Sequence, residues 1–210
     1  MERLETFDLA GNYLGDVDRG EFYKEIKDEF EKTGKISRQV KSIRLFLMNS
    51  QGRIYLQKRS KLKNENAGLY DKSVGGHVVK GDSLNVTVIK ECAEELGFPA
   101  AIVEDGEFNT AVHNTDLAVI GIFHKLSEEN VFMSKRINAD GKMMDQPFIS
   151  AFYLGYFDGP IRFSDGESSG IETMSLPELL VEIKDNPDKF TEDLKYMVNK
   201  FQDKLVAIGK

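Results

Sequence analysis

The sequence predicts a mixed α+β fold in which one β-sheet is sandwiched between helices. Two observations predict this fold class. Strand-like segments dominate the middle of the chain, and amphipathic helical segments lie at both ends, with one further helix embedded between strands. The 210 residues suffice for one ordinary domain, and no linker-like stretch interrupts them. We therefore expect a single domain over 1–210, with an N-terminal extension at 1–40 and a core at 41–210.

The N-terminal extension is predicted to be a hairpin followed by a helix. Apolar residues flank the pair Gly11-Asn12, which is typical of a turn. A helix is expected over 21–33, with Asp18 or Gly20 at its start and Gly34 at its end. Its apolar stripe would consist of residues at i, i+4 and i+8, namely Phe22, Ile26 and Phe30.

The core elements follow from shorter patterns. Strands over 42–48 and 53–57 flank a turn-forming segment and predict a hairpin. Polar stretches without periodicity predict loops over 58–68 and 164–170, and a loop or hairpin insertion over 125–147. Further strands are expected at 69–74, 100–104, 116–124, 148–157 and 171–174, and further helices at 83–96, 177–184 and 188–206.

The amino-acid composition limits the classes of function and partner that we expect for the chain. The net charge of −7, from 35 acidic and 28 basic residues, argues against a nucleic-acid-binding surface. The single cysteine, Cys92, cannot form an internal disulfide, which favours a reducing compartment. No apolar run is long enough for a membrane span, and the first residues do not have the pattern of a leader peptide. We expect a cytoplasmic protein without membrane or nucleic-acid partners.

The helix expected over 83–96 carries three carboxylates, Glu91, Glu94 and Glu95, at positions i, i+3 and i+4. Like charges at this spacing repel one another, and two of them sit in the last turn, where the helix dipole disfavours anions. A hard divalent cation such as Mg²⁺ would remove the repulsion, because it prefers carboxylate, phosphate and water oxygens. A solvated acidic helix face is the alternative. On a helical wheel the opposite, apolar face would hold Val86, Ile89, Cys92, Ala93 and Leu96.

The stretch from Gly76 to Phe98 resembles the signature of the Nudix hydrolases, G-x5-E-x7-R-E-U-x-E-E-x-G-U, in which U is a bulky apolar residue. In register, Gly76 is followed after five residues by Asp82, and Asp82 after seven residues by Lys90-Glu91-Cys92-Ala93-Glu94-Glu95-Leu96-Gly97-Phe98. The resemblance implies a mixed sheet between helices and a site for Mg²⁺ or Mn²⁺ at the three glutamates. It also implies hydrolysis of a phosphoanhydride in a small-molecule diphosphate linked to another group.

Two positions depart from this signature. Asp82 stands where the family has glutamate, and Lys90 stands where it has arginine. Aspartate is one methylene shorter, and lysine lacks the planar fork that holds a carboxylate bidentately. A catalytically weak Nudix module that only binds its ligand is therefore one alternative. Cys92 occupies the apolar position of the signature and is expected to pack as a small hydrophobe.

Within the family, the stretch over 56–78 looks most like the branch that contains isopentenyl diphosphate isomerase. That enzyme uses a cysteine directly before the Gly-His of its loop, and Gly75 stands there in this chain. It also builds a metal site from upstream histidines, whereas His77, His113 and His124 are the three histidines here. Isomerisation is thus the rival interpretation, and hydrolysis is favoured. His77 is expected to hold its loop by hydrogen bonds.

The resemblance to that branch also implies substrate contacts. Arg59 and Lys63 match positions that contact a diphosphate, so these two residues and Gly76 are the expected substrate-binding residues. Glu91, Glu94 and Glu95 are the expected catalytic and metal-binding residues, and Glu167 is a candidate for an additional acid. The leaving group would be selected by loops over 20–40, 105–116 and 125–147. The N-terminal hairpin and helix could serve as a lid, as the arm of a homodimer or as packing.

Overall fold

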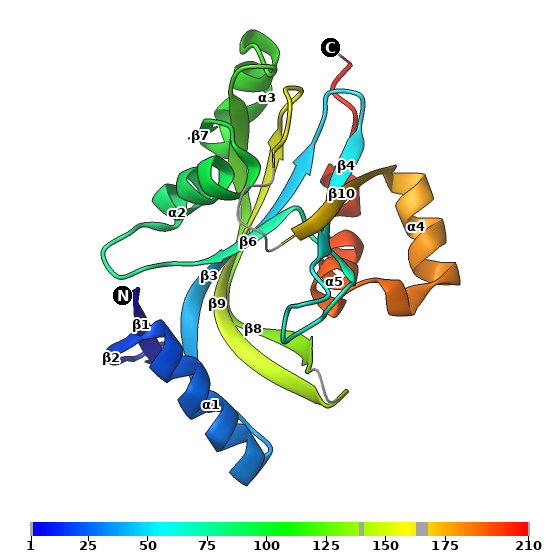
Figure 1. Cartoon of the computed structure of the whole chain (residues 1–210). Helices are drawn as coiled ribbons and strands as arrows, with labels where there is room; N and C mark the ends of the chain where they lie inside the picture. The colour runs from blue at the N-terminus through cyan, green and yellow to red at the C-terminus, as the bar shows by residue number, and fades with distance from the viewer. Residues whose placement is uncertain (1, 139–140, 163–167, 210) are drawn as a thin grey trace.

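The fold is organised around the central strand β3 (Arg38–Met48) of one strongly curved sheet (Figure 1). The computed structural model describes residues 2–138, 141–162 and 168–209. Ile43, Leu45 and Leu47 of β3 contribute to one hydrophobic cluster, whereas Phe46 and Met48 contribute to another. Side chains alternate between the two faces of a strand, so β3 needs apolar residues on both sides because both of its faces are covered.

Each edge of β3 is paired. On one edge β9 (Met143–Tyr156) runs parallel to it along Val40–Met48. On the other edge three antiparallel strands pair in turn, namely β1 (Arg3–Asp8), β6 (Val74–His77) and β4 (Arg53–Arg59). The sheet is completed by β2 (Tyr13–Asp18), β5 (Tyr70–Asp71), β7 (Ala100–Ile102), β8 (Gly121–Ile137) and β10 (Ser168–Ser175).

Helices cover the sheet on both sides, which confirms the expected α+β class. Figure 1 shows α2 (Leu84–Glu91) and α3 (Asp105–Asn114) on one side, and α4 (Leu176–Asp185) and α5 (Glu192–Phe201) on the other. The buried face of α5 consists mainly of Leu194, Met197, Val198 and Phe201, as its apolar periodicity predicts. None of the described helices has the length and apolar character that crossing a bilayer requires.

The N-terminal extension forms the expected hairpin of β1 and β2, followed by α1 (Arg19–Thr33). Asp18 caps this helix by accepting hydrogen bonds from Gly20 and Glu21, and Gly34 ends it in the left-handed conformation. Phe22 and Ile26 are fully buried. The extension therefore packs on the sheet, which is one of the three roles expected for it, besides a lid and the arm of a homodimer.

Several sequence expectations need correction. The segment 105–114 is helix α3 rather than a loop. Within the segment 125–147, residues 125–137 belong to β8 and residues 143–147 to β9, and these strands pair antiparallel with two register shifts, so the hairpin alternative was right and the loop alternative wrong. The strand expected over 116–124 begins only at Gly121, and the strand expected over 69–74 is divided into β5 and β6. The helix expected over 188–206 is α5 flanked by two short 3₁₀ turns.

Candidate active site

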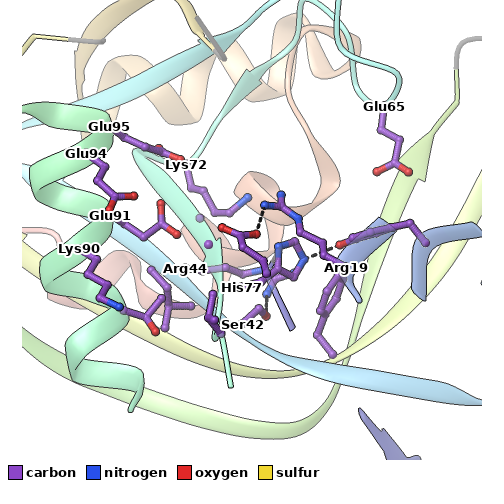
Figure 2. A pocket seen from close by; sticks show the side chains of 18 of the residues that line it. Arg19, Ser42, Arg44, Glu65, Lys72, His77, Lys90, Glu91, Glu94 and Glu95 are labelled. Atoms are coloured by element: carbon purple, nitrogen blue, oxygen red, sulfur yellow. Dashed lines mark hydrogen bonds and ion pairs between the residues drawn. The ribbon is translucent and has the colours of Figure 1, made fainter. Parts of the chain in front are cut away.

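A cleft of about 710 Å³ opens between α2, β6, α1 and β8 (Figure 2). All six described residues that the sequence proposes for the site line this cleft, namely Arg59, Lys63, Gly76, Glu91, Glu94 and Glu95. Glu167, the candidate for an additional acid, lies outside the described residues. The cleft has an acidic wall formed by Glu91, Glu94 and Glu95, and Asp82 lies beside it in the loop before the helix. Opposite lies a cationic wall, which takes its side chains from α1, β3, β8 and the segment 59–72.

The acidic wall is one continuous helical segment. Ser83 caps α2 by accepting a hydrogen bond from the Val86 backbone, which offsets the poor helix propensity of the β-branched residues that follow. After Glu91 the chain widens into a π-helical turn, η1 (Cys92–Leu96), and Gly97 stops it with φ of 76°. A π-helical turn inside an α-helix is often found at functional sites.

The buried face of this segment differs from the face that the helical wheel predicts. Thr87, Val88, Cys92, Glu95 and Leu96 are buried. Val86 and Ile89 are 39% and 40% exposed, and Ala93 is exposed as well. The wheel fails because the π-helical turn departs from 3.6 residues per turn, and because the face towards β3 follows the i+4 row of Val88, Cys92 and Leu96. Cys92 packs there as expected, and burial raises the pKa of its thiol far above the usual range.

Gly76 and Glu91 are in close contact. A Cβ atom on Gly76 would overlap the Glu91 carboxylate, so only glycine leaves room for that side chain beside β6. Gly76 pairs with Ile43 in the centre of β3, which fixes this contact to the sheet. The glycine of the signature thus lets the first glutamate lie against the strand.

The two departures from the signature are partners. Lys90 donates a hydrogen bond to Asp82, with 2.7 Å between Nζ and Oδ2, and it ties the last turn of α2 to the loop before the helix. This pairing raises the pKa of Lys90. A shorter acid and a flexible base together preserve an ion pair between these two positions.

The cationic wall rests on a buried ion network. The Arg44 guanidinium on β3 contacts Asp193 of α5 at 3.1 Å, donates to Ser42 at 2.6 Å and also donates to Ser150. It lies 4.3 Å from the centre of the Phe132 ring. Arg44 is 2% exposed, and an arginine this deeply buried needs a carboxylate partner. Asp193 provides this partner and also accepts a hydrogen bond from Ser134 at 2.7 Å.

A second buried pair lies beside the first. The Lys72 ammonium is 3.1 Å from Asp71 and 3.6 Å from Asp193. Burial lowers the pKa of Lys72, and the two carboxylates oppose that shift. Burial alone would raise the pKa of Asp71, but Lys72 and Arg59 outweigh it and hold that pKa far below its ordinary value. The Asp71 carboxylate is therefore ionised at neutral pH.

Arg59 and Lys63 lie where the cationic wall meets the segment 59–72. The Arg59 guanidinium donates to the Glu65 carbonyl oxygen at 3.0 Å and lies 3.4 Å from the Asp71 carboxylate. It therefore shapes its own loop besides facing the cleft. Lys63 lines the cleft and is half-buried.

The three histidines occupy different surroundings. His77 lines the cleft, and its Nε2 and the hydroxyl of Tyr23 on α1 hydrogen-bond to each other, as expected for a residue that holds its loop. His113 is exposed and bonds the Asn109 carbonyl oxygen at 2.7 Å. His124 is buried, pairs with Asp105 at 2.9 Å and lies outside the cleft lining. His113 and His124 are thus a surface and a core residue.

Sequence reasoning missed the basic residues that dominate the cleft. Arg44 lies in the apolar run of β3, where a lone arginine is a signal that it has a buried partner. Lys72 precedes the glycines of β6, and Arg136 lies in a segment that was interpreted as a polar insertion. Asp193, the partner of Arg44 and Lys72, is far away in sequence, so no local pattern connects it with them.

The donor set of the acidic wall fits a hard divalent cation. Its three carboxylates belong to one helical segment, and Gly76 gives the first of them room beside the sheet. Such oxygen ligands suit Mg²⁺ or Mn²⁺. Within the described residues, no three acidic, histidine or cysteine side chains are already gathered tightly enough to form a metal-binding group. Bound metal would have to draw the three carboxylates together.

Comparisons with known proteins show the family of the chain. The family model described as the NUDIX domain matches residues 38–194. The isopentenyl-diphosphate Delta-isomerase of Serratia proteamaculans is 25% identical over 178 residues, which cover 85% of this chain and 83% of that protein.

Two solved structures share the fold. The crystal structure of DR0079 from Deinococcus radiodurans has a TM-score of 0.62 and 21% identity, and the match covers 95% of this chain and 98% of that one. A bifunctional NMN adenylyltransferase/ADP ribose pyrophosphatase from Francisella tularensis, complexed with AMP and a Mn ion, has a TM-score of 0.53 and 17% identity. That match covers 89% of this chain and 47% of the other. Since the family model spans most of the sequence, the chain belongs to the Nudix hydrolase family.

Proposed function

We propose that this chain is a Mg²⁺- or Mn²⁺-dependent pyrophosphohydrolase that cleaves the phosphoanhydride bond of a small-molecule diphosphate linked to another group. The observation that carries the proposal is the division of one cleft into an acidic and a cationic wall. Both walls suit a diphosphate, because a metal held by the glutamates would neutralise part of its charge and basic side chains would neutralise the rest. The Mn ion in the Francisella structure supports this choice of metal.

The residues of the chain have separate tasks in this proposal. Glu91, Glu94 and Glu95 would hold the metal, which would supply Lewis-acid activation of water and stabilisation of charge on the phosphate oxygens. Arg59 and Lys63 bind the diphosphate, and Gly76 lets the substrate and Glu91 approach β6 closely. One glutamate of the acidic wall accepts the proton of the attacking water. The water oxygen bonds to phosphorus as the bridging anhydride oxygen leaves, and the two products are phosphates.

Isomerisation is the second candidate, because a curated relative carries that activity in its name. Two features of the cleft argue against it. Gly75 stands at the position of the isomerase cysteine, and a Cβ atom there would lie 2.6 Å from Cε of the buried Lys72. The part of the chain before His77 contains no histidine. This chain therefore lacks the thiol and the histidine ligands that the resemblance assigns to the isomerase.

A module that binds its ligand without catalysis is the third candidate. The Lys90–Asp82 ion pair weakens it, because the two departures that suggested a defective site compensate each other. We further propose that 1–210 is one domain that acts in the cytoplasm. Whether it forms a homodimer stays a prediction.

The test follows cleavage of the anhydride bond by ³¹P NMR in a panel of nucleotide sugars, dinucleotides, prenyl diphosphates and nucleoside triphosphates with Mg²⁺. We expect turnover of at least one anhydride, loss of most of it in Glu94→Gln and Glu95→Gln, and unchanged circular dichroism spectra. Unchanged turnover in both variants contradicts the proposal. Metal-dependent binding without turnover by the wild type would support the binding module instead.

A further inference from the structure

We propose that the end of the cleft between α1 and β8 binds a second anionic group of the substrate. This group is a phosphomonoester on the moiety that is attached to the diphosphate. Arg19 and Lys27 from α1 and Arg136 from β8 would form this subsite. The inference rests on the proposed function, because it assigns the part of the substrate that lies away from the anhydride.

The helix α1 is a fixed wall of the cleft. Phe22 and Ile26 are fully buried in a cluster with residues of β1, β3 and β9. The next residue, Tyr23, is hydrogen-bonded to His77 of β6. Since β6 also carries Gly76, which contacts Glu91, the distance between α1 and the acidic wall is set by the sheet.

One edge of α1 faces the cleft. Arg19, Tyr23 and Lys27 are spaced at i, i+4 and i+8, so they lie in one row, and all three line the cleft. Arg19 is ion-paired with Glu2 at 2.7 Å, but both side chains are about half exposed. An exposed pair of this kind contributes little, so a phosphate dianion can compete for the guanidinium. Figure 2 shows Arg19 beside His77, with Glu91 and Glu94 across the cleft.

Arg136 is largely buried, which by itself would lower its pKa, but nearby acidic groups, with Asp193 and Glu65 foremost, outweigh this burial and raise the pKa. Its side chain is 14% exposed, and its carboxylate contact, with Glu65, is as long as 3.9 Å. The guanidinium carbon lies 5.6 Å from the centre of the Phe148 ring. The buried Nε has no hydrogen-bond acceptor among the described residues. Leaving a buried donor unsatisfied is unfavourable, and a turn of the Arg136 side chain towards the cleft would let a phosphate oxygen supply the missing acceptor.

The charges around His77 make the electrostatic potential in this part of the cleft positive. Burial lowers the pKa of His77 well below its usual value, and the neighbouring Arg19 and Arg136, followed by Arg44 and Lys72, lower it further. These four basic residues come from separate segments of the chain. Their convergence creates a local positive potential in a protein of net charge −7.

The side chains that line the cleft also restrict the kind of moiety that can carry the phosphomonoester. Apart from glycines and the Tyr23 ring, the apolar side chains that line the cleft are Ile43, Val79 and Phe148 in the described part of the chain. Pockets for apolar ligands are lined mainly by apolar side chains. An isoprenoid chain would therefore meet charged groups here, whereas a phosphorylated sugar or nucleotide would meet hydrogen-bond donors and two aromatic rings.

The test compares matched pairs of diphosphates that differ by one remote phosphomonoester, with Mg²⁺ and the full chain. NADP⁺ is paired with NAD⁺, and coenzyme A with dephospho-coenzyme A. We expect the phosphorylated member of at least one pair to have a kcat/KM about tenfold higher, caused by a lower KM. The reason is that charge-assisted hydrogen bonds are roughly twice as strong as neutral ones. Arg19→Ala and Lys27→Ala should each reduce this ratio. Lys24→Ala, an exposed lysine of the same helix outside the cleft lining, should retain it.

The outcomes separate the subsite from the proposed function. Turnover without preference for either phosphorylated member, or a preference that survives in the Arg19→Ala/Lys27→Ala double variant, overturns the subsite and leaves hydrolysis intact. If no pair is hydrolysed, calorimetry with NADP⁺ and NAD⁺ decides. Tighter binding of NADP⁺ that depends on Lys27 supports the subsite without the proposed hydrolysis, and equal dissociation constants overturn it.

Discussion

The two walls of the cleft are built in opposite ways. The acidic wall is one helical segment, and its three carboxylates lie within five consecutive residues. The cationic wall collects basic residues from α1, β3, β8 and the segment 59–72, and it depends on Asp193 of α5 for its charge balance. The comparison shows that metal-binding chemistry can be encoded locally, whereas recognition of the remaining substrate depends on tertiary structure.

The largest expected effect concerns the acidic wall. Glu95→Gln should lower Mg²⁺-dependent turnover by ~10²–10³-fold, the typical loss when one group that stabilises developing charge is removed. Steady-state hydrolysis of the best panel substrate measures it. The matched control is Glu107→Gln on α3, an exposed glutamate outside the cleft lining. An equal loss in both variants would contradict a special role for the acidic wall.

Substitutions in the ion network behind the cationic wall should instead lower the stability of the protein. Asp193→Asn removes the carboxylate that neutralises the buried Arg44 and Lys72, so it should lower the free energy of unfolding by about 3–5 kcal/mol. Urea denaturation followed by circular dichroism measures this change. The control Asp185→Asn lies exposed at the end of α4 and should change stability by less than about 0.5 kcal/mol. A similarly small change in Asp193→Asn would show that the network is dispensable.

The same network has a defined pH dependence. Basic neighbours outweigh burial and lower the pKa values of Asp71 and Asp193, so the unfolded chain binds protons at a higher pH than the folded chain. Their contribution to stability is complete above about pH 4, the ordinary aspartate pKa, and is lost as the pH falls through the folded values. Urea midpoints measured from about pH 6 downward should decrease more steeply below about pH 4 in the wild type than in Asp193→Asn. Parallel curves would contradict this assignment.

A substitution at the junction of the two walls should have a smaller effect on turnover. Gly76→Ala places a methyl group against the Glu91 carboxylate and should displace it, lowering turnover by about tenfold, the scale on which misplaced catalytic groups act. Gly106→Ala on α3 is the control, because a Cβ atom there meets open space. It should leave turnover unchanged and stabilise the helix by about 0.5–1 kcal/mol. Equal turnover in the two variants would contradict the proposed contact.

The smallest effect is expected from restoring the signature residues. Because Lys90 and Asp82 already pair, the double variant Asp82→Glu/Lys90→Arg should change turnover by less than about threefold and stability by less than about 1 kcal/mol. Parallel hydrolysis and urea measurements test this. A much more active double variant would show that the departures weaken the enzyme.

Sequence predictability follows the same division between local and distant features. The resemblance of the local spacing to the Nudix signature singled out the three glutamates, and cap residues such as Asp18, Gly34 and Ser175 marked helix ends that the structure confirms. Helix α3 was missed because its N-terminal residue Glu104 makes no side-chain cap, and because its sequence contains weak helix formers, including Gly106.

The ends of β8 and β9 were harder to predict because their polar side chains resemble a loop, while their pairing depends on partners across the hairpin. The Arg44–Asp193 pair spans most of the chain, so single-sequence periodicity carries no trace of it. The predicted face of α2 failed because a π-helical turn is not encoded in an ideal helical wheel.

The most direct test of the central claim is ³¹P NMR of the wild-type reaction in ¹⁸O-labelled water with Mg²⁺, using the substrate panel and isopentenyl diphosphate. If water attacks phosphorus at the acidic wall, one phosphate product carries ¹⁸O, its resonance is shifted, and Glu95→Gln forms little of it. An isomerised diphosphate whose anhydride bond is intact, or phosphate products without ¹⁸O, would contradict the account.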